Sequence, residues 1–147
     1  MLQSCSFLKE LHIKSCDAML RLFTSSTAKM LIHLEELQVE ECYSLKEIVG
    51  EEQQGETTEH VIKFKQLRRI ILRSLKNLKC FYSGNVTLML PSLIQLHIVD
   101  CSEMKVFSYG NVSASKEIQV SYNSEEIEVS YHCSTAQVSS TMILMPL

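Results

Sequence analysis

One pattern of apolar residues occurs four times along this chain of 147 residues and limits its fold more than any other feature. In the first copy, Leu8–Cys16, the pattern is L-x-x-L-x-I-x-x-C, and it begins again at Leu34, Leu67 and Leu93. The starting positions 8, 34, 67 and 93 are separated by 26, 33 and 26 residues. Each copy continues with two further apolar residues, and only the third copy has Leu75 in place of the final Cys. Four matches of this length indicate a tandem repeat.

Repeats with this spacing are typical of leucine-rich-repeat solenoids. The L-x-L segment predicts a short strand whose two apolar side chains point inward. Successive strands stack side by side, and each coil buries its apolar face only against its neighbours. The predicted fold class is α/β: a leucine-rich-repeat solenoid fragment with short parallel strands on the concave side and an irregular or short-helical convex side. Ser25 or Ser26 would cap a short convex helix carrying Ala28, Met30 and Leu31.

The chain divides into a regular part and an irregular part. Residues 1–114 are predicted to form about four coils, with an acidic, solvated loop inserted at 50–60. Residues 115–147 are predicted to form degenerate C-terminal strands or a cap, followed by a tail. Within them, the similar segments 117–122 and 126–131 alternate in polarity, which predicts two antiparallel strands.

Charge and hydropathy exclude several classes of partner. Fourteen Lys and Arg against 17 Asp and Glu give a net charge of -3, which predicts no nucleic-acid partner and no anionic membrane partner. No apolar run reaches the roughly 20 residues of a membrane-spanning helix. Residues 1–10 lack the apolar segment of a signal peptide. We therefore expect a cytoplasmic protein with reduced cysteines.

Two kinds of side chain could in principle build a catalytic or metal site. Cys16, Cys42 and Cys101 share the inward turn position, whereas His12 and His97 share an outward strand position. Metal ligands must converge on one ion at about 2.0–2.3 Å, which opposite sides of a coil do not allow. A catalytic Cys–His pair also needs an orienting third group, and the pattern supplies none. The sequence therefore predicts structural cysteines, no cofactor or metal site, and no enzymatic activity.

The outward positions of the strands form three lateral rows when the repeats are aligned. The predicted rows are Glu10, Glu36, Arg69, Gln95 and Glu117; His12, Gln38, Ile71, His97 and Gln119; and Lys14, Glu40, Arg73, Val99 and Ser121. The second strand is acidic and the third is basic, so neighbouring strands about 4.8 Å apart are predicted to pair opposite charges.

The third strand is the predicted centre of a partner-binding surface. Arg69 and Arg73 have acidic neighbours on one side only, and an apolar strip of Ile71, His97 and Val99 lies beside them. Arginine next to aliphatic surface is typical of an interaction hot spot, so an acidic partner segment is predicted to dock there. The full predicted set on the concave face is Arg69, Ile71, Arg73, His97, Val99, Glu36, Gln38 and Glu40. In the alternative interpretation, Glu36 and Glu40 take up all the binding capacity of the two arginines, and Ile71 is an isolated exposed aliphatic residue.

The residues at 34–49, 78–82 and 91–101 also carry a family resemblance. Over residues 7–113 the chain resembles the C-terminal leucine-rich-repeat region of plant intracellular nucleotide-binding immune receptors, the coiled-coil class of disease-resistance proteins. The Cys at the turn position, and the lack of an L-x-G-x-I-P signature, point to the intracellular class. The resemblance implies a protein–protein recognition module for pathogen sensing and autoinhibition in plant defence. The implied partner is the receptor's own nucleotide-binding domain, a pathogen effector or a host guardee.

The chain departs from the family in one important respect. It contains no G-x-x-x-x-G-K-[ST] phosphate loop, so the nucleotide switch of the family cannot be assigned to these residues. A stand-alone leucine-rich-repeat scaffold or adaptor therefore remains the alternative function. The open edge at Leu8–Ile13 further predicts that the isolated chain is marginally stable or self-associates.

Overall fold

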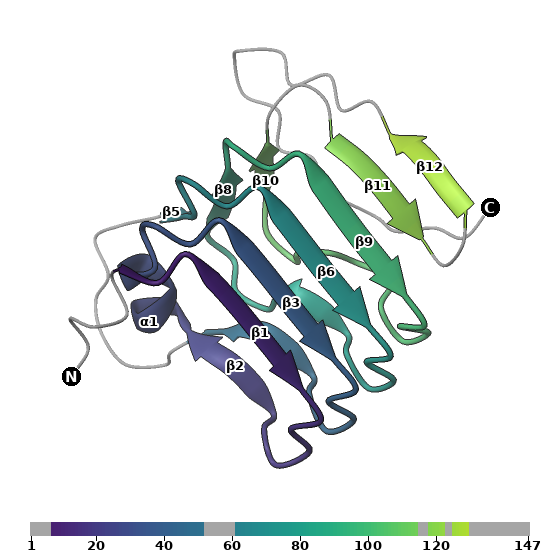
Figure 1. Cartoon of the computed structure of the whole chain (residues 1–147). Helices are drawn as coiled ribbons and strands as arrows, with labels where there is room; N and C mark the ends of the chain where they lie inside the picture. The colour runs from purple at the N-terminus through teal and green to yellow at the C-terminus, as the bar shows by residue number, and fades with distance from the viewer. Residues whose placement is uncertain (1–6, 52–60, 115–117, 123–124, 130–147) are drawn as a thin grey trace.

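The computed structural model describes residues 7–51, 61–114, 118–122 and 125–129. These residues form a solenoid of stacked coils, in which strands far apart in sequence lie side by side (Figure 1). The elements are β1 (Glu10–Lys14), β2 (Arg21–Thr24), α1 (Ser25–Met30), β3 (Glu36–Glu40), β4 (Glu47–Gly50), β5 (Val61–Lys63), β6 (Arg69–Arg73), β7 (Cys80–Tyr82), β8 (Thr87–Leu90), β9 (Gln95–Val99), β10 (Val112–Ala114), β11 (Ile118–Tyr122) and β12 (Glu125–Val129). The predicted leucine-rich-repeat solenoid with parallel strands is thereby confirmed.

The largest sheet has the order β1-β3-β6-β9-β11-β12. Its first five strands are parallel, and the repeat offsets gave the register of the first four: Glu10 pairs with Glu36, Glu36 with Arg69, and Arg69 with Gln95. The inward residues of these strands, such as Leu37 and Ile70, are fully buried. This sheet carries the three rows of outward side chains.

The predicted register of the fifth strand is wrong by two residues. Gln95 lies beside Gln119 instead of Glu117, and His97 lies beside Ser121 instead of Gln119. The predicted neighbours Val99 and Ser121 are therefore not paired. The alternation of side chains determines only which face of the sheet a residue occupies. A shift of two residues therefore keeps Val120 buried, and both registers agree with the alternation of apolar and polar residues.

The other sides of the coils contain strands that the sequence pattern did not predict. Two three-stranded parallel sheets form there, with the orders β2-β4-β7 and β10-β8-β5. Within the described residues the α-helical content is limited to the six residues of α1. The described residues thus contain little helix, and the α/β class with an irregular or short-helical convex side stays a prediction.

The short helix lies where the sequence predicts it, but its cap is different. Thr24 is the N-cap, and its hydroxyl oxygen accepts a hydrogen bond from the backbone nitrogen of Thr27 at 3.4 Å. Ser25 and Ser26, the predicted caps, are the first two helical residues. Thr24 takes the N-cap position because it is the last residue of β2 and has the extended backbone that an N-cap requires. Ala28, one of the apolar residues predicted on this helix, is fully buried.

Aromatic residues fill the core behind the large sheet. The rings of Phe81 and Phe107 are stacked with centroids 4.8 Å apart, and Phe64 meets Phe81 edge-on at 6.2 Å. All three side chains are fully buried. Phe81 and Phe107 occupy the last apolar position of successive repeats, so the repeat itself builds this column.

Each concave strand from β1 to β9 ends in the same unusual turn. Ser15, Glu41, Ser74 and Asp100 have φ angles of 59°, 52°, 53° and 54°, which is the left-handed region that non-glycine residues rarely adopt. The backbone nitrogens of the first three donate to a carbonyl of the next coil, as Ser74 does to Val99 at 2.8 Å. These lateral hydrogen bonds hold the turns of neighbouring coils in register.

The cysteines at the turn position bind the backbone. The sulfur of Cys101 lies 3.4 Å from the carbonyl oxygen of Val99 and 3.6 Å from that of Leu72 in the preceding coil. Cys42 contacts the carbonyl oxygen of Glu40 at 3.3 Å. A thiol is small enough for the interior and supplies a weak donor, so these residues are structural, as predicted.

The C-terminal hairpin extends the large sheet. β11 pairs with β12 in antiparallel orientation, from Ile118 opposite Val129 to Tyr122 opposite Glu125, which confirms the predicted antiparallel pair. The division into 1–114 and 115–147, and the role of the hairpin as a cap, stay predictions. Residues 52–60 of the acidic loop and the tail after 129 lie outside the described residues.

Candidate functional site

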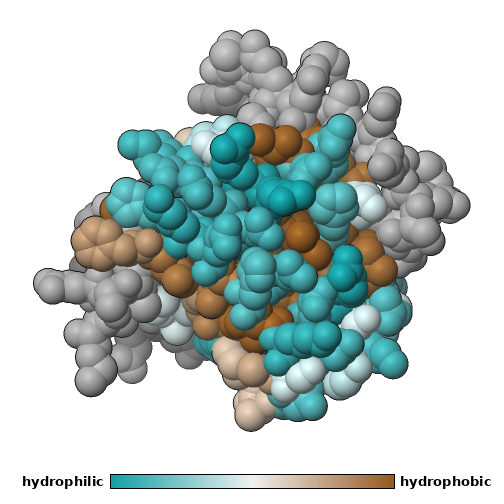
Figure 2. All heavy atoms as spheres, in the orientation of Figure 1, coloured by the Kyte–Doolittle hydropathy of each residue, from teal (hydrophilic) through white to brown (hydrophobic). Residues whose placement is uncertain are grey.

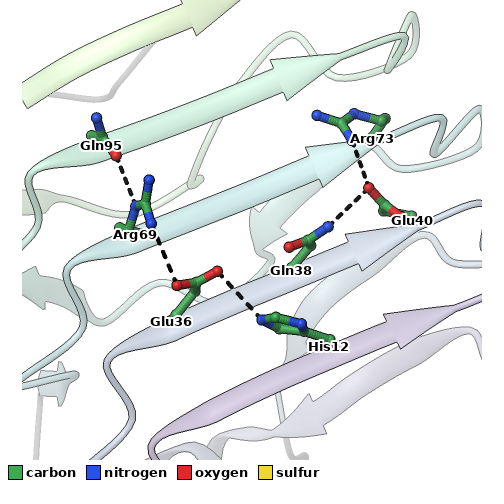
Figure 3. Close-up of polar contacts among 7 residues, drawn as sticks. All are labelled: His12, Glu36, Gln38, Glu40, Arg69, Arg73 and Gln95. Carbon is green, nitrogen blue, oxygen red and sulfur yellow. Dashed lines mark hydrogen bonds and ion pairs between the residues drawn. The ribbon is translucent and has the colours of Figure 1, made fainter.

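The outward side chains of the large sheet form a polar network across neighbouring strands (Figure 3). At the C-terminal end of the strands, Nη1 of Arg73 on β6 lies 2.7 Å from Oε1 of Glu40 on β3. The same carboxylate oxygen accepts a hydrogen bond from Nε2 of Gln38 at 2.9 Å. The predicted pairing between the acidic and the basic strand is therefore present.

The network is longer at the other end of the strands. Nη1 of Arg69 lies 3.7 Å from Oε2 of Glu36, and its Nε donates to Oε1 of Gln95 at 2.8 Å. The second oxygen of Glu36 lies 3.3 Å from Nε2 of His12 on β1. Gln95 brings no charge to Arg69, in line with the sequence pattern, but its amide oxygen provides an acceptor. Arg69 is consequently held on both sides.

The acids and the bases differ in how far they reach into solvent. The side chains of Glu36 and Glu40 are 19% and 14% exposed, whereas those of Arg69 and Arg73 are each 51% exposed. An arginine has five N–H donors, and these contacts use two on Arg69 and one on Arg73. The outward face of β3 and β6 is therefore rich in exposed guanidinium donors, and the carboxylates beside them are less exposed.

A strip of less polar residues lies next to the arginines. Ile71 pairs with His97 across β6 and β9, and Arg73 pairs with Val99. Ile71, His97 and Val99 are half-buried, each lying between neighbours on the same face of the sheet. Figure 2 shows apolar patches between the hydrophilic side chains on this face of the molecule. The five residues predicted to contact a partner thus lie together on two adjacent strands.

The structure adds a groove that the sequence analysis missed. An open groove of about 380 Å³ lies where the large-sheet strands begin. It is lined by Glu10, Glu35, Glu36, Arg68, Arg69, Ile94 and Gln95. Arg68 is exposed and forms no ion pair with any described residue, and Ile94 is 43% exposed. Their strand parity predicts inward side chains, but both precede the first strand residue, where the turn overrides alternation.

The histidines and cysteines do not converge. Among the described residues, no three His, Cys, Asp or Glu side chains lie close enough to hold a metal ion together. Burial raises the pKa of the Cys101 and Cys80 thiols to about 11, and it also raises that of Cys42. These thiols are protonated at neutral pH and have little nucleophilic character.

The coils and their exposed sheet define a leucine-rich-repeat solenoid, a recognition or scaffold fold rather than a catalytic one. A scan against protein families matches residues 1–130 to the family described as plant disease resistance protein RPS2-like, leucine-rich repeats. The chain belongs to this family. No curated protein and no solved structure matches the chain significantly. No helix in the described part of the chain has the length and apolar character needed to cross a bilayer.

Proposed function

We propose that this chain is the recognition segment of a cytoplasmic plant immune receptor and that it binds an acidic protein segment on its large sheet. The family assignment supports a protein-interaction role in disease resistance. The observation that carries the proposed surface is the exposure of Arg69 and Arg73 beside the half-buried strip of Ile71, His97 and Val99. Exposed guanidinium groups next to aliphatic surface match a partner that offers carboxylates and apolar side chains.

Electrostatics also favours a competing carboxylate at this surface. The Glu36 to Arg69 contact is long, at 3.7 Å, and both arginines are half exposed, so each pair contributes at most about 1 kcal/mol. A partner carboxylate therefore has free N–H donors available without breaking a strong pair. Glu36, Gln38 and Glu40 would hold the guanidinium groups in place before a partner docks. The two arginines would then lose less side-chain entropy on docking.

In a receptor, this surface would act as a switch element. The proposed partner is either the receptor's own nucleotide-binding domain, which gives autoinhibition, or a pathogen effector or host guardee, which gives sensing. Both roles require that the surface binds one state of the receptor better than another, because only differential binding shifts an equilibrium.

Charge reversal tests the proposed surface directly. The probe is a fluorescent peptide of alternating Asp, Glu and Leu residues, titrated against the full chain and followed by fluorescence anisotropy. The double variant Arg69→Glu and Arg73→Glu should weaken binding by about tenfold or more, because it replaces two attractions with two repulsions. The matched control is Lys79→Glu with Lys105→Glu, which changes the net charge equally at exposed positions outside the large sheet.

Two outcomes would contradict the proposal. Equal weakening by both double variants would show that only net charge matters. Unchanged binding by the folded arginine variant would remove this face as the site. In the complete receptor, the same arginine variant should also change autoactivity, measured as cell death in leaves without a pathogen.

A stand-alone scaffold or adaptor is the second candidate function. It rests on the absence of a phosphate loop from these residues. The genomic sequence upstream of Met1 separates the two functions. A phosphate-loop domain in the same reading frame favours the receptor, whereas a stop codon or an unrelated domain favours the scaffold.

A further inference from the structure

The first coil presents an apolar end of the solenoid. β1 and β2 are the outermost strands of their sheets on this side of the molecule (Figure 1). The repeat residues of the first coil are only half-buried: Leu8, Leu11, Ile13, Cys16, Met19 and Leu22. Their counterparts one coil later are no more than 1% exposed: Leu34, Leu37, Val39, Cys42, Leu45 and Ile48. The described residues therefore leave this end with apolar surface that every later coil buries.

Along the edge of β1 that faces away from β3, which is called the free edge here, backbone groups are unpaired among the described residues. The carbonyl of Lys9 accepts from the nitrogens of Glu35 and Glu36, and the nitrogen of Ser15 donates to Glu40. In a parallel pair, both backbone groups of a residue point to the same neighbour, and successive residues alternate. The odd residues of β1 therefore face β3. The backbone groups of Glu10, His12 and Lys14 point away from it.

The outward charges of β1 are not neutralised within the coil stack. Glu10 lies beside Glu36, a like charge, and Lys14 lies beside Glu40, whose carboxylate is occupied by Arg73 and Gln38. Neither Glu10 nor Lys14 forms an ion pair with a described residue. Both charges would be paired if a cation lay across the free edge from Glu10 and an anion lay across it from Lys14.

We propose that a second copy of the chain docks on this edge, with the two β1 strands antiparallel and His12 opposite the partner's His12. This register places Glu10 opposite the partner's Lys14 and Lys14 opposite the partner's Glu10. Leu11 then lies across from the partner's Ile13 on the inward face. The paired residues 10, 12 and 14 are the ones whose backbone groups face the free edge, so the ladder forms without rotating either strand.

Charge selects this register over its neighbours. In the proposed register the two-fold axis passes at His12. If the axis moves by one residue, either Glu10 or Lys14 lies opposite the partner's His12. Both pairs of Glu10 with Lys14 are then lost. The two-fold arrangement is also closed, because each copy uses the same edge and no further copy can join it. At the other end of the large sheet, β12 is the outermost strand and is antiparallel to the rest, so the two ends are not equivalent.

Charge swapping in the 147-residue chain tests the interface. Sedimentation velocity over about 1–100 µM should show the wild-type chain passing from monomer to dimer and no further. The variants Glu10→Lys and Lys14→Glu should each raise the dimer dissociation constant by about tenfold or more, because two cross-strand pairs become repulsive. Lys105→Glu is the control of equal charge change on an exposed residue outside β1, and it should dimerise like the wild type.

Two further samples keep the test decisive if a single variant is less well folded. The double variant Glu10→Lys with Lys14→Glu restores both unlike pairs and should recover the wild-type constant. An equimolar mixture of the two single variants should form heterodimers, because one chain then carries two lysines and the other two glutamates. A wild-type chain that stays monomeric, forms larger oligomers, or is not rescued by the swap would overturn the proposal.

Discussion

The backbone nitrogen of Cys16 lies 3.4 Å from the sulfur of Cys42, one coil further along the solenoid. The same sulfur contacts the carbonyl oxygen of Glu40. The Cys42 side chain therefore forms hydrogen bonds to the backbone of its own coil and of the preceding coil. Cys101 repeats the arrangement on the carbonyl side, with contacts to Val99 and Leu72.

Raising the pH should destabilise the fold through these thiols. Burial raises the pKa of Cys101 from 9.0 to about 11, so the unfolded chain loses the proton first. The stabilising effect is complete below pH 9 and is lost as the pH rises toward 11. Urea unfolding between about pH 8 and pH 10.5 should lose about 1–2 kcal/mol that the Cys101→Ala variant does not lose. Equal pH dependence of the two proteins would contradict a buried, protonated thiol.

The pair of Arg73 and Glu40 should contribute little to stability. Half of the Arg73 side chain is exposed, so a double-mutant cycle with Arg73→Ala and Glu40→Gln should give a coupling of about 0.2–1 kcal/mol. Because the pair is open to solvent, about 1 M NaCl should remove most of this coupling. A coupling well above this range would mean that the pair holds the sheet together instead of presenting a surface.

Truncating the aromatic column should be among the most harmful changes. Phe81 is fully buried between Phe107 and Phe64, so Phe81→Ala should lower the free energy of unfolding by about 3–5 kcal/mol. Phe7 is 77% exposed, and Phe7→Ala should change stability by no more than about 0.5 kcal/mol. Denaturant unfolding followed by circular dichroism compares the two. Similar losses for both would refute the assignment of the core.

The left-handed turn can be tested at Ser74, whose φ is 53°. Ser74→Gly removes the clash of Cβ with the backbone and should be neutral or stabilising by up to about 1 kcal/mol. Ser74→Val adds a branched side chain at the same angle and should cost about 1–2 kcal/mol. Thermal unfolding ranks the two variants against wild type. The opposite order would show that the turn is not left-handed in solution.

The sequence pattern predicted the repeat, the inward residues and the register of the first four concave strands. Those features follow from one apolar side chain at each fixed position, which is fully buried in the coils after the first. The pattern could not predict the register of β11, where Gln119 lies beside Gln95, because two registers two residues apart bury the same side chains. It also missed β2, β4 and β7, whose three or four residues are too short to show a period.

The candidate site was predictable only where strand geometry decided it. That Arg73 lies beside Glu40 on the same face of the sheet follows from the repeat offsets and from side-chain alternation. The contact of Arg69 with Gln95 was not predictable, because either amide or carboxylate neighbours suit a guanidinium group. The exposure of Arg68 and Ile94 depends on turns before the strands, where periodicity no longer applies.

The lateral hydrogen bonds between coils, such as that from Ser74 to Val99, have a mechanical consequence. They run along the solenoid axis, whereas the strands run across it. A pull along the axis loads the bonds of one coil boundary at a time, so the coils peel away in succession at low force. A pull along the strands loads the bonds of several boundaries together in shear. We therefore expect the molecule to be softer along its length than across it.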